Sequence, residues 1–358
     1  MGNFQKIIKI LSPRPAIGGL EISDSYLRFV LIKERKVDFF SIKLPPGIVE
    51  NGKVKDQSGL LLLLKALHSK ITYKKNKKIY AIIGISDENI YTSLINLPAI
   101  AAGSIDDAAR LNLQMVSPVD FETIYADWQK IGDKEMAGGN QIEILGAFAP
   151  KTVVNEFEKV LDEAGFVIAA VEFPALSLVR ALMEQGENIF KENIYLYLRI
   201  GSEGLTYGIV KNGNLYFVHF VAWNSAFGEN KKIEINSFKD LIVSETKKVL
   251  NFHENHIGGK IEKFFVVAPG FVEEIIKTLS GTFPSIKAEV FKLKQFKELS
   301  ISWFSALGLA LRGFIPRSDD NLITLASVDT DVKFSNYQII AFIRMWRNIA
   351  FTILGVVL

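Results

Sequence analysis

The sequence predicts an α/β protein built from two similar halves, with a compact α+β subdomain inserted into the first half. The order strand, polar turn, strand, tight turn, strand occurs over residues 17–44 and is repeated over 194–222. Each set is followed by an apolar helical segment and then by another buried-type strand. Between 96 and 165 the pattern changes to two helices with extended segments between them, which suits a separate insertion.

Apolar strands separated by turn residues define the first half. Ser23-Asp24-Ser25 is a polar turn between two strands, and Pro45-Pro46-Gly47 ends a third, alternating strand. A leucine-rich run then indicates a helix, which a lysine-rich turn separates from a strand of consecutive apolar residues. The expected strands are 17–22, 26–32, 36–44, 79–85, 89–96 and 167–171, and the expected helices are 59–70 and 175–184.

The insertion and the second half follow from the same kind of pattern. Gly138-Gly139-Asn140 marks a hairpin turn, and apolar residues at helical spacing before Gly165 indicate an amphipathic helix. Within the insertion we expect helices 106–116 and 153–164, an extended segment 118–129 and a strand 143–149. In the second half we expect strands 194–200, 205–210, 215–222 and 263–268, with helices 238–254 and 272–279.

The composition excludes several classes of site. The 358 residues include no cysteine, which excludes disulfides, zinc–thiolate sites, iron–sulfur clusters and thiol catalysis. A net charge of +3 is too small to indicate nucleic acid as a partner. His253 and His256 lie three residues apart without a third ligand nearby, so we expect no metal site. Residues 1–14 form a basic amphipathic segment, for which a helix on an anionic membrane and a frayed basic terminus are both open interpretations.

Five segments of the chain carry a resemblance to a known family. They lie at 19–28, 44–56, 164–182, 245–253 and 308–312. The most specific is Leu-Pro-Pro-Gly-Ile-Val-Glu-Asn-Gly-Lys-Val-Lys-Asp at 44–56, and the last reads Gly-Leu-Ala-Leu-Arg. In this order the segments resemble the type IV pilus assembly protein PilM family, part of the actin-like group that includes the division protein FtsA.

The resemblance implies an actin-like fold, which is a duplicated ribonuclease-H-like α/β fold of two lobes. Lobe I is expected over 15–95 and 166–190, an interaction subdomain over 96–165, and lobe II over 191–315. In such folds two β-hairpin turns face each other and cradle phosphate groups, while neighbouring carboxylates hold magnesium and its waters. The corresponding nucleotide-binding positions here are Glu21, Ser23, Asp24, Ser25, Arg199, Gly201, Gly204, Glu245, Lys248 and Gly270.

Three of these site elements depart from the family pattern. Glu21 and Ser23 replace the usual aspartate and glycine of the first loop, and the Cβ of Ser23 restricts the approach of the backbone to a phosphate. Arg199 replaces the aspartate of the second loop, and Pro269 removes an N–H from the adenosine loop. We therefore expect weak ATP binding at most, without magnesium. If the loops oppose each other, Arg199 pairs with Glu21 and locks the cleft; otherwise it faces solvent or caps a neighbouring loop.

The C-terminal tail carries a second resemblance. A linker over 316–338 contains Asn321, Leu322, Ile323 and Leu325, which resemble the Ile-Asn-Leu-Leu-Pro start of PilN, the protein that PilM binds. This segment is expected to dock in a groove of its own chain. Residues 339–358 are strongly apolar and are expected to begin a transmembrane helix, although the uncharged run from 349 is only half of the roughly 20 residues a span needs. A buried helix is the alternative. Arg344 and Arg347 place the preceding domain in the cytoplasm.

These observations predict a non-catalytic scaffold at the cytoplasmic face of the bacterial inner membrane, anchored by its C-terminal helix. The machine is a type IV pilus or a related secretion or competence system. The expected partners are a PilN-like segment, in the same chain or in another, and other proteins of the inner-membrane platform. The alternatives are an active actin-like ATPase, a relative of sugar kinases and an FtsA-like membrane-associated filament protein.

Overall fold

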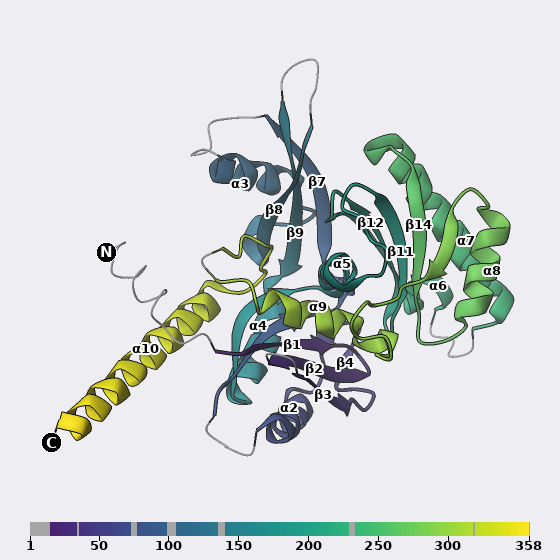
Figure 1. Ribbon diagram of the computed structural model, residues 1–358. Coiled ribbons are helices and arrows are strands. Elements are labelled where there is room, and N and C mark those ends of the chain that lie inside the picture. The colour runs from purple at the N-terminus through teal and green to yellow at the C-terminus, as the bar shows by residue number, and fades with distance from the viewer. Residues whose placement is uncertain are drawn as a thin grey trace.

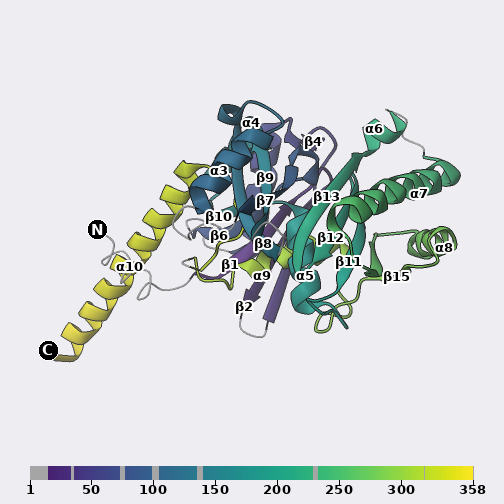
Figure 2. The same cartoon turned by 90° about the horizontal axis from the view of Figure 1, so that it is seen from above.

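The computed structural model describes residues 15–33, 36–72, 77–98, 105–134, 140–228, 233–317 and 319–357, with side chains up to Thr352 in the last range. The basic amphipathic segment predicted at residues 1–14 lies outside the described residues. Two five-stranded sheets and a three-stranded sheet form the body, and a long helix extends away from it (Figures 1 and 2).

The sheet of lobe I has the strand order β10-β6-β1-β2-β3. β1, β2 and β3 are antiparallel neighbours, while β6 and β10 run parallel to β1. Apolar residues at consecutive positions of β6 and β10 are buried, as expected for central parallel strands. The strands are β1 (Ile17–Ile22), β2 (Tyr26–Lys33), β3 (Lys36–Lys43), β6 (Ile79–Gly84) and β10 (Phe166–Glu172), with a short hairpin β4 (Val49–Glu50) and β5 (Lys53–Val54) beside them. The helices of this lobe are α2 (Gln57–Ile71) and α5 (Pro174–Gln185).

The sheet of lobe II repeats this topology in the order β13-β12-β11-β14-β15. Its first three strands are again antiparallel, and β14 and β15 are parallel to β11. The strands are β11 (Ile194–Ile200), β12 (Gly204–Lys211), β13 (Asn214–Ala222), β14 (Ile261–Val267) and β15 (Lys287–Val290), and the helices are α6 (Trp223–Phe227), α7 (Ile235–Phe252), α8 (Val272–Thr282) and α9 (Phe304–Arg312). The predicted duplication is confirmed. β15 was not predicted: its residues, Lys-Ala-Glu-Val, alternate polar and apolar, but the segment is only four residues long.

Helices α5 and α9 join the lobes at the centre of the molecule (Figure 1). α9 follows lobe II in the chain but packs on β1, β2 and β6 of lobe I, while α5 contacts β12 and β13 of lobe II. The two helices approach each other so closely that a Cβ on Gly308 would lie 1.8 Å from the carbonyl oxygen of Ser177. A glycine is therefore required at this crossing.

A separate three-stranded antiparallel sheet with the order β7-β9-β8 lies beside lobe I. It consists of β7 (Tyr91–Pro98), β8 (Ile124–Lys134) and β9 (Gln141–Pro150), and α3 (Ile105–Val116) packs on it through Ala109 and Leu113. Helix α4 (Lys151–Glu163) then returns to lobe I, where it contacts α2 and β10. On the side away from β6, β10 has no strand neighbour among the described residues of its sheet.

Among the described residues, the last helix, α10 (Val328–Val357), packs on the body near its start, where Phe334 and Tyr337 lie against the β6–β10 side of lobe I. From there it projects away from all other elements (Figures 1 and 2). The transmembrane character predicted for 339–358 is not supported: within the described residues, no helix has a long enough apolar stretch to cross a membrane. Arg344, Arg347 and Asn348 interrupt the apolar side chains of this helix.

Candidate functional site: the interlobe ion pairs and the tail groove

The duplication places Glu21 and Arg199 at equivalent positions of the two lobes. Each is the last residue but one of the first strand of its sheet, β1 or β11, and precedes the first hairpin turn. Arg28 lies opposite Glu21 on β2. Because the two hairpin turns face each other between the lobes, the two strand ends bring opposite charges together.

Arg199 joins the lobes through a buried ion pair. Its Nη2 donates to Oε1 of Glu21 at 2.8 Å, and its Nη1 lies 3.6 Å from Oδ2 of Asp87. The Arg199 side chain is 12% exposed, while both carboxylates are 1% exposed. Burial alone lowers the pKa of Arg199, but Glu21 and Asp87 more than offset this effect and raise it above its ordinary value. The Glu21–Arg199 pair that the sequence analysis considered is therefore present.

Asp87 holds three segments together and was not predicted as a site residue. Its Oδ1 accepts a hydrogen bond from the backbone N–H of Ala175 at the start of α5, and its Oδ2 accepts one from Thr206 Oγ1 on β12, both at 2.9 Å. Complete burial raises the pKa of Asp87, against the opposing effect of Arg199. The available sequence signal was an acidic residue three positions after the end of the buried strand β6, a region typical of site residues in α/β sheets.

The other predicted nucleotide-binding residues do not share one cavity. Ser23, Ser25, Arg199 and Gly201 line a cavity of about 360 Å³, with Pro269 on its wall, next to Gly270 in the chain. Asp24 lines a second cavity of about 570 Å³. Glu245 and Lys248 line a third, of about 490 Å³, where Glu245 is bonded to both Lys248 and His219 at 2.7 Å. Gly204 lies on β12, where its missing Cβ lets the carbonyl of Val221 approach.

Potential metal ligands do not cluster in the described part of the chain. No group of three or more His, Asp or Glu side chains there has an arrangement that would hold a metal ion. His253 is buried, with Nδ1 lacking a hydrogen-bond partner, and burial lowers its pKa. His256 instead lies on the exposed side, close to the Phe252 carbonyl.

The acidic residues near the hairpin turns predict a pH dependence of stability. Burial, together with the nearby carboxylates of Asp24 and Glu203 and against the opposing effect of Lys53, raises the pKa of Glu88 to about 7. Since this folded-state pKa exceeds the ordinary value of 4.5, the folded protein binds more protons between these pH values. Stability should therefore fall as pH rises from about 5 to 8, and Glu88→Gln should flatten this decline in the melting temperature. The exposed Glu122→Gln should leave the profile unchanged, and an identical slope in both variants would refute the assignment.

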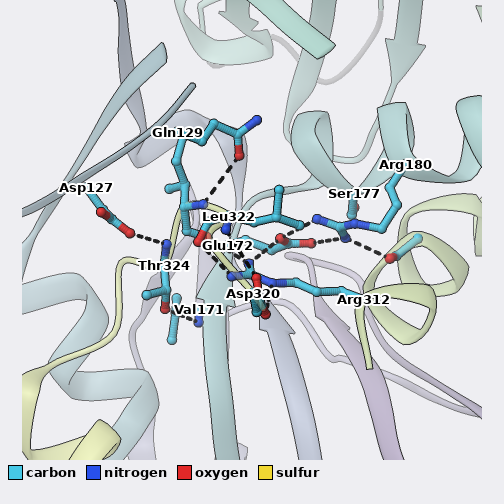
Figure 3. Close-up of polar contacts among 12 residues, drawn as sticks. Asp127, Gln129, Val171, Glu172, Ser177, Arg180, Arg312, Asp320, Leu322 and Thr324 are labelled. Carbon is cyan, nitrogen blue, oxygen red and sulfur yellow. Dashed lines mark hydrogen bonds and ion pairs between the residues drawn. The ribbon is translucent and has the colours of Figure 1, made fainter. Parts of the chain in front are cut away.

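The tail segment Asp320–Ser327 lies in a groove between β8 and the open edge of β10 (Figure 3). Leu325 donates its N–H to the Val171 carbonyl at 2.7 Å, and Thr324 Oγ1 accepts from the Val171 N–H at 3.2 Å. The N–H groups of Ile323 and Thr324 donate to Gln129 and Asp127 on β8. The side chains of Ile323 and Leu325 are completely buried. The predicted docking of this segment in its own chain is thus observed: the segment lies along the edge of β10, to which the Leu325 N–H and the Thr324 hydroxyl join it.

A buried ion network around Arg312 and Glu172 holds the tail segment in its groove. The Arg312 guanidinium donates to Glu172 at 2.6 Å, to Asp320 at 2.9 Å and to the carbonyls of Leu322 and Ile323. Glu172 also receives two hydrogen bonds from Arg180, at 2.7 and 2.9 Å. Burial would raise the pKa of Glu172, but the two arginines more than offset it, so this pKa lies below its ordinary value. The motif predicted from the sequence includes Asn321, which is exposed in the structure. The buried ion network around Glu172 was not predicted.

Removing the Thr324 hydroxyl tests how the segment is held. Thr324→Val keeps the shape of the side chain but leaves the buried N–H of Val171 without an acceptor. We expect a loss of about 1–3 kcal/mol in the free energy of unfolding, measured by urea denaturation. Thr278→Val is the matched control, because the Thr278 hydroxyl caps a carbonyl on the exposed surface of α8. A change of less than about 0.5 kcal/mol is expected there; equal losses would contradict the role of Thr324.

Comparison with known proteins places this geometry in context. A chain of a solved PilM–PilN type IV pilus biogenesis complex has a TM-score of 0.65 and 19% identity to this chain, and the match covers 85% of this chain and 100% of that one. The fold is PilM-like. Sequence comparison adds nothing to this assignment, because no protein-family model and no curated protein matches the sequence.

Two further solved structures are similar over most of their length. One is the ethanolamine utilization protein EutJ from Carboxydothermus hydrogenoformans, with a TM-score of 0.47, 13% identity and coverage of 84% of this chain and 90% of that one. The other is the cytoplasmic domain of EpsL, an inner membrane component of the type II secretion system of Vibrio cholerae, with a TM-score of 0.46, 8% identity and coverage of 88% and 99%. Both scores lie below 0.5, so neither similarity indicates a function for this chain.

Proposed function

We propose that this chain is a non-catalytic scaffold of a type IV pilus, or of a related secretion or competence machine, at the cytoplasmic face of the inner membrane. The observation that carries the proposal is Arg199, which occupies the end of β11 and bridges Glu21 and Asp87 between the lobes. A cation at this position replaces the carboxylate that an actin-like magnesium site needs. The similarity in fold to a chain of a pilus biogenesis complex supports the choice of machine.

The carboxylates between the lobes do not fit a magnesium ion. Glu21 uses Oε1 for Arg199 and Oε2 for Arg28, which lies 3.5 Å away. Asp87 uses its two oxygens for Ala175 and Thr206. Magnesium requires oxygen ligands in near-octahedral geometry, and both carboxylates are already engaged by nitrogen and hydroxyl donors. ATP, if bound, would therefore be bound weakly and without metal.

The docked tail supports a particular mode of assembly. The groove between β8 and β10 accepts an extended segment, and residues 320–327 of the same chain fill it. A tethered segment competes at a high effective concentration with any segment supplied by another protein. We infer that this chain carries its PilN-like segment within itself, and that the other platform proteins bind elsewhere on its surface.

Calorimetric titration tests the loss of catalysis. The heat released when ATP is titrated into the purified chain should be the same in magnesium as in EDTA. A separate assay should detect no release of phosphate from ATP over hours. Magnesium-dependent binding together with hydrolysis would instead establish the alternative of an active actin-like ATPase.

A deletion in the native organism tests the scaffold itself. Loss of the gene should abolish surface pili, or secretion or DNA uptake through the machine concerned, and a plasmid copy should restore it. An unaffected deletion strain would refute the scaffold role, whatever the outcome of the nucleotide titration.

A further inference from the structure

Strand β8 of the inserted subdomain is bonded to the tail segment and, a short distance along the same strand, to lobe II. Asp127 and Gln129 accept the N–H groups of Thr324 and Ile323 in the tail groove. Immediately after these residues, the backbone of Ile131 accepts hydrogen bonds from β13 of lobe II. One strand therefore contacts both the tail and the second lobe.

A β-bulge makes the Ile131 carbonyl available to lobe II. The register of β8 against β9 shifts between Lys130 and Gly132, so Ile131 has no opposite residue on β9. Its carbonyl oxygen instead accepts a hydrogen bond from Nδ2 of Asn214, the first residue of β13, at 3.0 Å. The bulge thus directs a backbone acceptor of the inserted subdomain toward the other lobe.

The hydroxyl of Tyr216 on β13 completes this contact. It donates to Oε2 of Glu143 on β9 at 2.9 Å and lies 3.3 Å from the Ile131 carbonyl oxygen. Tyr216 and Glu143 are both buried. A Cβ on Gly132 would lie 2.4 Å from the hydroxyl, so the glycine permits the close approach. We call the contact of Asn214 and Tyr216 with Ile131 and Glu143 the lobe II latch.

We infer that docking of the tail segment and closure of the lobe II latch are coupled, so that each stabilises the other. Undocking of the tail would remove the N–H partners of Asp127 and Gln129, and Gln129 is only 4% exposed in the docked state. A buried polar group without a partner is costly, so β8 would shift to bring these side chains into water. Because β8 is hydrogen-bonded to β9 along its length, the shift moves the bulge and Glu143 together, away from β13.

The coupling makes the position of the inserted subdomain on lobe II depend on whether the tail groove is filled. Linkage requires that the latch stabilise the docked tail by the same factor by which the docked tail stabilises the latch. This inference goes beyond the scaffold role and rests only on the contacts of β8. Its failure would therefore leave the genetic test of the scaffold unaffected.

Hydrogen exchange of the tail tests the coupling from the side of the latch. Tyr216→Phe removes the hydroxyl that bonds to Glu143 and keeps the ring in place. Peptide 320–327 contains the Leu325 amide, which is bonded to the Val171 carbonyl in the docked state. If the coupling is complete, loss of one hydrogen bond at the latch should make this peptide exchange roughly fivefold faster.

Tyr195→Phe is the matched control. Tyr195 is also a completely buried tyrosine of lobe II, and among the described residues its hydroxyl bonds only to Phe190 and Asn193, outside the inserted subdomain. The substitution weakens lobe II without removing a latch contact, so peptide 320–327 should exchange at close to the wild-type rate. A rate in Tyr216→Phe that does not exceed the rate in Tyr195→Phe would overturn the inference.

Distances between two spin labels test the coupling from the side of the tail. The chain has no cysteine, so Gln114→Cys on α3 and Glu273→Cys on α8 label only the inserted subdomain and lobe II, at exposed positions. Ile323→Asp places a charge at a completely buried position of the tail and should broaden the distribution of distances between the labels. Asn321→Asp adds the same charge at an exposed position of the tail and should leave the distribution unchanged.

A folded Ile323→Asp variant with the narrow distribution of Asn321→Asp would also overturn the inference. Circular dichroism establishes whether Ile323→Asp is folded. The exchange measurement on Tyr216→Phe and Tyr195→Phe decides the question without that variant, because neither substitution introduces a charge into the core.

Discussion

Replacing Glu172 by glutamine is expected to lower the free energy of unfolding by about 3–5 kcal/mol. Glu172 is completely buried and is bonded to both Arg180 and Arg312 (Figure 3). The substitution leaves the Arg312 side chain, with no exposed surface, and the Arg180 side chain, 8% exposed, without their common counter-charge. The loss should appear as a lower urea midpoint. Because Arg312 also holds the tail, limited proteolysis after Arg317 should become faster.

The matched control is Glu187→Gln. Glu187 pairs with Lys297 at 3.7 Å on the surface, where the two side chains are 34% and 73% exposed. Exposed pairs contribute between 0 and about 1 kcal/mol, so a small change is expected. If Glu172→Gln were as mild as Glu187→Gln, the buried network would not be what fixes the tail in its groove.

Replacing Arg199 by methionine is expected to cost a similar amount, about 3–5 kcal/mol. Glu21 and Asp87, each 1% exposed, would then lie between the lobes with only Arg28 nearby, at 3.5 Å from Glu21. Burial already raises the pKa of Asp87 against the opposing effect of Arg199, so this pKa should rise further in the variant. A carboxyl group whose pKa is higher in the folded than in the unfolded state makes the free energy of unfolding fall as pH rises. The variant should therefore lose less stability at pH 5 than at pH 8.

The double variant Arg199→Met with Glu21→Gln separates charge from packing. Glutamine removes one of the two unpaired charges, so the double variant should regain part of the stability that Arg199→Met loses. Arg110→Met, on the exposed surface of α3, should change the free energy of unfolding by less than about 0.5 kcal/mol. A double variant less stable than Arg199→Met alone would show that Arg199 acts through packing and not through charge.

Local patterns were sufficient for the architecture of the two lobes. Strand-length apolar runs with polar turns define β1 to β3 and β11 to β13, and their repetition indicates the duplication. The resemblance to the PilM family predicted the Glu21–Arg199 pair as one of two alternatives, on the condition that the two hairpin turns oppose each other, and the structure shows this pair. The apolar tail shows the limit of this reasoning, since composition favoured a membrane-type helix that the described part of α10 does not support.

The sequence by itself determined the order of the elements, the charge at each hairpin and the motif at 321–325. Only the tertiary structure decided that Asp87, Glu172 and Arg312 are the centres of the two polar networks, and that Glu245 and Lys248 line a different cavity from Arg199. The physical reason is the separation along the chain over which each interaction acts. Hydrophobic periodicity and turn chemistry act over a few residues, whereas Glu172 and Arg312 are 140 positions apart and meet only because α9 crosses back onto lobe I.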